Sequence, residues 1–113
     1  MPPKTNPAKL NPLQLRTLTL LQAIARVPGA ASANAAGEAV ITQFPSAHGD
    51  HFHLGNAMVN GKDATGLYNE AVWNALTRKG LAKSEYPHRI ALTREGLAYD
   101  TGLADEILRH GGH

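Results

Sequence analysis

Residues 68–99 read YNEAVWNALTRKGLAKSEYPHRIALTREGLAY, and this stretch decides the fold because its local signals agree with one another. Asn69 is a suitable N-cap, and Glu70 places a carboxylate at the positive end of a helix. Gly80 suits the left-handed residue with which many helices end. The pattern therefore predicts a helix from about Glu70 to Lys79.

The predicted helix has two different faces. At 100° per residue, Val72, Trp73 and Leu76 gather on one side, which we expect to be core. The opposite side is short and polar and should face solvent; it comprises Glu70, Ala71, Asn74, Thr77 and Arg78.

After Gly80 the hydrophobic period changes from helical to alternating, which predicts a short strand over residues 81–85. Tyr86-Pro87-His88 reads as a turn, and residues 89–92 supply the returning strand. Thr93 is then a suitable N-cap for a last helical segment. The order helix, basic hairpin, helix predicts a winged helix.

The amino-acid sequence of this stretch resembles the end of the recognition helix, the wing and the following helix of MarR-like and PadR-like transcriptional regulators. The wing is shorter than in MarR proteins and lacks their acidic and arginine-rich tip, and no clean partner helix precedes Asn69. The resemblance implies an α+β winged-helix fold and sequence-specific binding to double-stranded DNA. The matching residues are Lys79, Gly80, Leu81, Lys83, Arg89, Leu92, Thr93 and Gly96.

The predicted DNA-binding residues fall into two groups. From the helix, Glu70, Asn74, Thr77 and Arg78 would face the major groove, where amide and guanidinium groups can bond base edges. From the wing, Lys83, His88 and Arg89 would contact phosphates.

Charge is unevenly distributed although the net charge is only +2. Residues 78–94 carry five cations and the single acid Glu85, whereas residues 95–109 are mainly acidic. A polyanion should be attracted to the wing and held away from the C-terminal end.

A chain of 113 residues with 42% hydrophobic residues is expected to form one domain. We predict a mobile arm at 1–11, a winged-helix domain at 12–109 and a frayed tail at 110–113. The sequence has no cysteine, so disulfides and thiolate metal sites are excluded. The absence of a long apolar run or signal-peptide pattern predicts a cytoplasmic protein without membrane association.

The best-marked helix outside the central stretch follows Asn11 and Pro12, an N-cap and a first-turn proline. Apolar residues from Leu13 to Val27 give it a broad buried surface, and Pro28-Gly29 should end it. Residues 30–37 are rich in alanine without a clear period, so helix and loop both stay open.

Residues 38–44 have the β-branched content of a strand. Phe52, Leu54 and Met58 share one parity, which predicts that residues 51–59 form a second strand paired with the first as a hairpin. In the alternative, Asn56 caps a short helix through Val59, the first helix of a helix-turn-helix.

A histidine-rich turn invites comparison with a metal site, since His48, His51 and His53 lie close to Asp50. Two imidazoles on one strand face can bind zinc or nickel when further ligands arrive. Metalloenzyme spacing such as His-Glu-x-x-His is absent, so we expect no metal and no cofactor.

Catalytic constellations are also absent, because Ser46, His48 and Asp50 have no nucleophile-elbow context and no Gly-rich phosphate loop occurs. We therefore expect no enzyme. The alternative to a DNA-binding regulator is a protein-interaction module in a larger assembly that uses the hairpin from Glu38 to Val59. A homodimer would have to use the first helix and the tail from Leu103 to Leu108.

Overall fold

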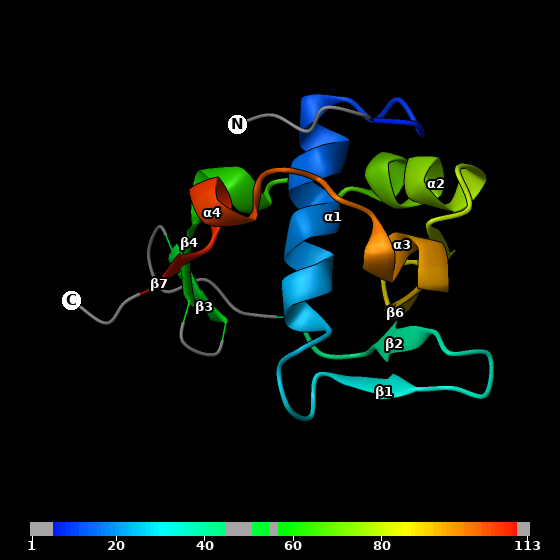
Figure 1. Ribbon diagram of the computed structural model, residues 1–113. Coiled ribbons are helices and arrows are strands. Elements are labelled where there is room, and N and C mark those ends of the chain that lie inside the picture. Colours follow the sequence, from blue (N-terminus) through cyan, green and yellow to red (C-terminus); the bar gives the residue numbers. More distant parts are fainter. Residues whose placement is uncertain (1–5, 45–50, 55–56, 111–113) are drawn as a thin grey trace.

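The structure is a computed structural model, and it describes residues 6–44, 51–54 and 57–110. Its central element is helix α1 (Pro12–Ile24), which runs through the middle of the molecule with a sheet on either side (Figure 1). The Asn11 side chain accepts from the Gln14 N–H at the helix start, as the sequence predicts. The helix ends at Ile24, earlier than expected, and the chain continues in turns through Gly29, which has a positive φ of 85°.

A four-stranded antiparallel sheet lies on one side of α1, in the order β1-β2-β6-β5. It consists of β1 (Ala31–Ala33), β2 (Ala39–Ile41), β5 (Ala82–Glu85) and β6 (Arg89–Leu92). Ile41, Ile90 and Leu92 are fully buried on its inner face. Helix α2 (Glu70–Arg78) and helix α3 (Arg94–Ala98) pack beside this sheet (Figure 1).

A three-stranded antiparallel sheet lies on the other side, in the order β3-β4-β7. Its strands are β3 (His51–Leu54), β4 (Ala57–Asn60) and β7 (Arg109–His110), with the 3-10 turn η1 (Gly61–Ala64) and the short helix α4 (Ala104–Ile107) beside them. We expected a frayed tail at 110–113, but His110 belongs to a strand that pairs with Ala57, and residues 111–113 lie outside the described residues.

The mixed α+β class with antiparallel sheets is as predicted, but the pairing before α2 is not. The hairpin expected between residues 38–44 and 51–59 is wrong, because β2 pairs with β1 and β6 whereas β3 pairs with β4. The alternative helix from Asn56 to Val59 is also wrong, since Ala57–Asn60 is a strand. Residues 30–37, left open by the sequence, supply β1 and the turn after it.

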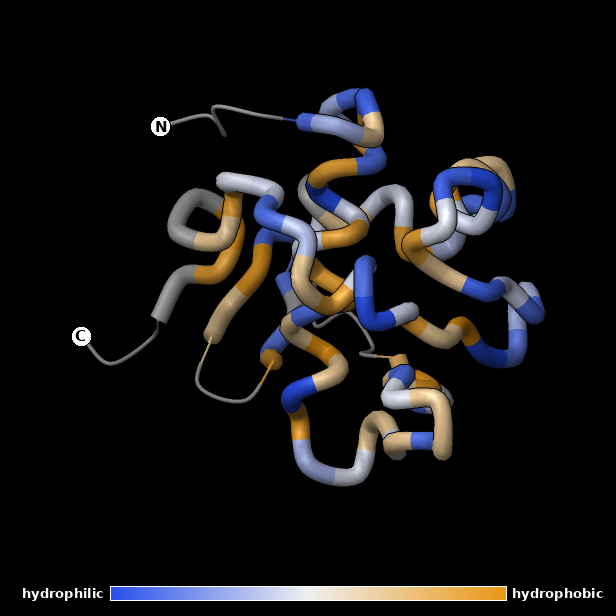
Figure 2. The backbone as a smooth tube through the Cα atoms, turned by 45° about the vertical axis from the view of Figure 1, so that its right-hand side comes forward, coloured by the Kyte–Doolittle hydropathy of each residue, from blue (hydrophilic) through white to orange (hydrophobic). Residues whose placement is uncertain are grey.

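The core surrounds α1, where Leu18, Leu20, Leu21 and Ile24 are at most 1% exposed. Figure 2 shows hydrophobic positions concentrated in the middle of the molecule and hydrophilic ones mostly on its outer loops. The buried part of α1 is covered within the chain itself, and a homodimer through the first helix and the tail from Leu103 to Leu108 stays a prediction.

The segment before α1 is also packed, contrary to the mobile arm expected for residues 1–11. Leu10 is only 5% exposed, and the Ala8 N–H donates to the Tyr99 hydroxyl at 3.1 Å. Asn6 contacts the same hydroxyl and donates to the Leu10 carbonyl. Residues 6–11 therefore form part of the folded domain, and residues 1–5 lie outside the described residues.

Candidate nucleic-acid interface

Helix α2 is held at both ends by the caps that the sequence predicts. The Asn69 side chain accepts from the Ala71 N–H at 3.0 Å. At the other end, the Gly80 N–H donates to the Thr77 carbonyl and the Leu81 N–H to the Leu76 carbonyl, both at 3.0 Å. This pair of bonds is a Schellman motif, and it requires the positive φ of 76° at Gly80. The motif turns the chain directly from α2 into the hairpin.

The burial of α2 follows its predicted faces. Val72, Trp73 and Leu76 are buried, and Glu70, Asn74 and Arg78 are exposed. Thr77 is exposed too, but its hydroxyl donates to the Trp73 carbonyl at 2.9 Å, so that proton is already used within the helix. The remaining groups present amide, guanidinium and carboxylate atoms to solvent.

The hairpin of β5 and β6, which we call the wing, carries its cations in ion pairs. Lys83 lies 2.9 Å from Glu38, and the Arg89 Nε lies 3.0 Å from the Glu85 carboxylate. His88 is exposed at the turn. The sequence could not show the first pair, because Glu38 precedes β2 and reaches Lys83 only through the sheet.

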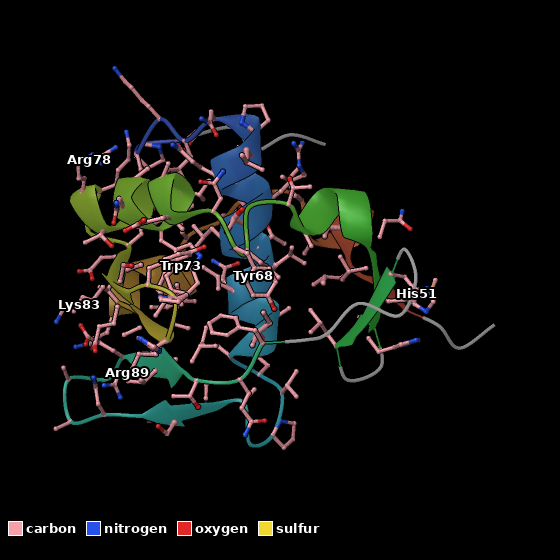
Figure 3. The ribbon with its side chains drawn as sticks, turned by 180° about the vertical axis from the view of Figure 1, so that it is seen from behind. His51, Tyr68, Trp73, Arg78, Lys83 and Arg89 are labelled. Carbon is pink, nitrogen blue, oxygen red and sulfur yellow. The ribbon has the colours of Figure 1, made fainter. Side chains whose placement is uncertain are left out.

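Figure 3 shows Arg78, Lys83 and Arg89 along one flank of the molecule. These three cations come from the end of α2 and from both strands of the wing. The structure thus brings the two predicted groups of DNA-binding residues onto neighbouring elements.

Contacts between aromatic residues connect the wing to α2. Tyr86 lies edge-on to Trp73 with ring centroids 4.8 Å apart, and its hydroxyl donates to the Tyr68 carbonyl at 2.8 Å. Phe44 also packs against Trp73, with ring centroids 5.5 Å apart. Tyr86 is therefore a packing residue more than an exposed contact, whereas Tyr68 is 55% exposed.

Lys79, at the C-cap of α2, extends the interface to the N-terminal segment. Its Nζ donates to the Ala8 carbonyl at 2.6 Å. One signal for this docking is Leu10, an apolar residue within a polar, proline-rich segment. Residues 6–10 consequently lie beside the end of the helix that carries Asn74 and Arg78.

Glu38 is the residue that sequence reasoning missed at the wing. The Asn34 side-chain amide, which donates to Glu38, and then Lys83 hold the pKa of this carboxyl below its ordinary value of 4.5. A lowered folded-state pKa means that the carboxylate stabilises the fold above the unfolded pKa. That contribution is lost as pH falls through the folded pKa.

We therefore expect the wild-type protein to lose stability on acidification below pH 4.5 more steeply than Glu38→Gln. Urea unfolding at a series of pH values measures the difference. Parallel pH profiles for the wild type and Glu38→Gln would contradict the role of Glu38.

Of the histidines considered as metal ligands, His51 and His53 belong to strand β3, and His51 lies on the opposite side of the molecule from the wing (Figure 3). The Nε2 atoms of His51 and His53 are 3.1 Å apart. Within residues 6–44, 51–54 and 57–110, no three histidine or acidic side chains are grouped as metal ligands would be. The candidates His48 and Asp50, like Ser46, lie outside the described residues.

No helix among the described residues has the length and apolar character that crossing a membrane requires. Comparison of the chain with protein-family models, with curated proteins and with solved structures gave no significant match.

Proposed function

We propose that this protein binds double-stranded DNA as a winged-helix domain, with α2 in the major groove and the wing on the phosphates. The observation that carries the proposal is the joint exposure of Asn74 and Arg78 on α2 and of Lys83 and Arg89 on the wing that follows it directly. Amide and guanidinium groups can bond base edges, and cations at the flank attract phosphate.

The sheet supports this reading. The second strand of the wing, β6, pairs with the earlier strand β2 in the register Val40 to Ala91, so the wing is extended by a strand from before α2. A helix followed by a hairpin that joins an earlier strand is the arrangement expected of a winged helix. The alternative hairpin surface from Glu38 to Val59 does not form, because its two halves belong to different sheets.

One element of a helix-turn-helix, its first helix, is replaced by other structure in this chain. Where a helix-turn-helix has its first helix, the segment before α2 contains β4 and the turn η1. The contacts that such a first helix would make with the DNA backbone must therefore come from other residues. Lys79 and the docked residues 6–10 lie at the end of α2 and are placed for that task. We propose that the protein uses this binding activity as a cytoplasmic transcriptional regulator.

The ion pairs of the wing determine how strongly we expect its cations to bind phosphate. A phosphate that binds Lys83 or Arg89 competes with Glu38 or Glu85. The Arg89–Glu85 pair is exposed on both sides and contributes little, and Lys83 is itself 66% exposed although the Glu38 side chain is only 11% exposed. The cost of this competition is small compared with the release of counterions from DNA. The pairs therefore weaken the phosphate contacts without preventing them.

The test is a titration of labelled duplex DNA at several salt concentrations. Lys83→Ala and Arg89→Ala should each weaken binding on every duplex and reduce the salt slope by about one unit, if each cation neutralises one phosphate. Arg26→Ala, which removes an exposed cation beyond the end of α1, is the control and should change neither quantity.

Asn74→Ala serves as the matched variant on α2. It should leave the salt slope nearly unchanged and relax the preference at one base pair by about 1 to 3 kcal/mol, if the contact is bidentate. If the double variant of Lys83 and Arg89 keeps the wild-type affinity and salt slope, the wing is not a DNA clamp. The protein-interaction module would then replace the regulator.

A further inference from the structure

Strand β1 is the end strand of the four-stranded sheet, and Figures 1 and 3 show it at the rim of the molecule with no other drawn strand beyond it. The Asn34 N–H donates to the Glu38 carbonyl, and the Thr42 N–H donates to the Ala30 carbonyl. Ser32 lies between these bonds and pairs with Val40. By the alternation of an antiparallel ladder, the N–H and C=O groups of Ala31 and Ala33 point to the outer edge.

The two edges of this sheet differ in how they are protected. Strand β5, at the far edge, presents the charged residues Lys83 and Glu85, which discourage pairing with another strand. Residues 27–37 contain no charged side chain, and Ser32 and Ala33 are exposed. The β1 edge therefore carries neither bulk nor like charge that would oppose the approach of an identical edge.

We propose that β1 is a dimer interface, at which a second copy of this chain pairs its own β1 antiparallel to the first. The two-fold axis passes between Ser32 and its counterpart. Ala31 then pairs with Ala33 of the second copy and Ala33 with Ala31, so the outward N–H and C=O groups of both strands are matched. The contact is isologous and closed, and it joins the two sheets into one continuous sheet.

An identical copy fits better than an unrelated extended peptide, because the small, uncharged side chains offer no pocket for a specific sequence. What the edge offers is a backbone pattern that is complementary to itself. The axis at Ser32 is the register in which all three residues of β1 are paired.

The joined sheet also has a spacing that suits DNA, an argument that rests on the proposed function. From β5 of one copy to β5 of the other, the strand order β5-β6-β2-β1 and its mirror sequence give seven steps. At about 4.8 Å a step, the two wings lie about 34 Å apart along the sheet. Dimeric DNA-binding proteins use half-sites one helical turn apart, about 34 to 36 Å.

The test is sedimentation of the full chain without DNA, from micromolar to millimolar protein. Wild-type protein should rise from the monomer mass of 12.0 kDa toward twice that value as the concentration increases. Ser32→Lys and Ser32→Glu should each stay monomeric, because each places two like charges opposite each other on non-hydrogen-bonded positions about 4.5 Å apart. Mixing the two variants in equal amounts should restore the dimer through opposite charges.

Ala36→Lys is the control, since it adds the same charge to the turn after β1 and should dimerise like wild type. Circular dichroism checks that the Ser32 variants fold, as expected for an exposed position. A wild type that stays monomeric throughout, or Ser32 variants that dimerise like it, overturns the proposal. Because no DNA is present, this failure is distinct from an unchanged salt slope in the wing variants, which overturns DNA binding instead.

Discussion

Replacing Trp73 with alanine should lower the free energy of unfolding by about 3 to 5 kcal/mol, enough to unfold a domain of marginal stability. Trp73 is only 1% exposed, and its ring packs against the rings of Phe44 and Tyr86. Its Nε1–H also donates to the Leu67 carbonyl at 2.9 Å. Alanine would leave both a cavity and a buried carbonyl that has lost this donor.

Urea unfolding followed by circular dichroism is the appropriate measurement, because Trp73 is the one tryptophan of the chain and its fluorescence is lost in the variant. Trp73→Phe is the matched control: it keeps an aromatic ring but removes the indole N–H, so its loss should be clearly smaller. Tyr68→Ala, at a largely exposed aromatic residue, should cost less still. An unchanged unfolding midpoint for Trp73→Ala would reject the core position of this residue.

The same residue determines which side of α2 faces outward. With Trp73 buried, Asn74 and Arg78 are rotated toward solvent, and Tyr86 fastens the wing to the same ring. The DNA-binding proposal therefore depends on the packing of one side chain that need not touch DNA.

Helices α1, α2 and α3 and the wing could be predicted because their signals are local. Asn11 with Pro12, and Asn69 with Gly80, cap α1 and α2 through bonds to residues a few positions away. Thr93 caps α3 in the same way, its hydroxyl accepting from the Gly96 N–H at 3.0 Å. Such contacts depend on a few neighbouring residues, so they can be predicted without knowing how the chain packs.

The strand pairing before α2 is only partly local. Strand β1 pairs with β2, and β3 with β4, as hairpins of neighbouring strands, whereas β2 also pairs with β6 and β4 with β7, which are distant in sequence. The sequence predicts that β2 pairs with residues 51–59, but β2 lies between β1 and β6, and its Ile41 is aligned with Ile90 in the interior of the sheet. Strand β1 has no period to reveal it, since its residues are alanine and serine. Strand β1 forms because it pairs with β2, and the alternation of residue types in β1 does not reveal this pairing.

The candidate site was predicted in its exposed residues but not in their partners. The outward position of Asn74 and Arg78 follows from helix geometry. The Glu38 carboxylate beside Lys83 and the Ala8 carbonyl at Lys79 depend on how the sheet and the N-terminal segment pack. Tertiary packing brings these groups together from outside the stretch that carries the motif.

Replacing Gly96 with alanine should be the second most damaging change, at about 3 kcal/mol, the upper end of the usual cost of overpacking. A Cβ at this position would lie 1.9 Å from the Leu81 carbonyl oxygen and 2.9 Å from its carbon. Both are backbone atoms, so the clash cannot be relieved by turning a side chain. The Leu81 carbonyl also accepts from the Thr93 N–H, and moving it would strain that bond.

Gly80→Ala is the matched control, measured in the same urea titration. Its Cβ would meet open space, so its cost is that of a positive φ in a residue with a side chain, about 1 to 2 kcal/mol. If Gly96→Ala costs no more than Gly80→Ala, α3 does not pack directly on the start of β5. The spacing of Leu92, Thr93 and Gly96, which the resemblance includes, would then need another explanation. In this structure Gly96 lets α3 pack against the backbone of Leu81, which links the end of α2 to the first strand of the wing.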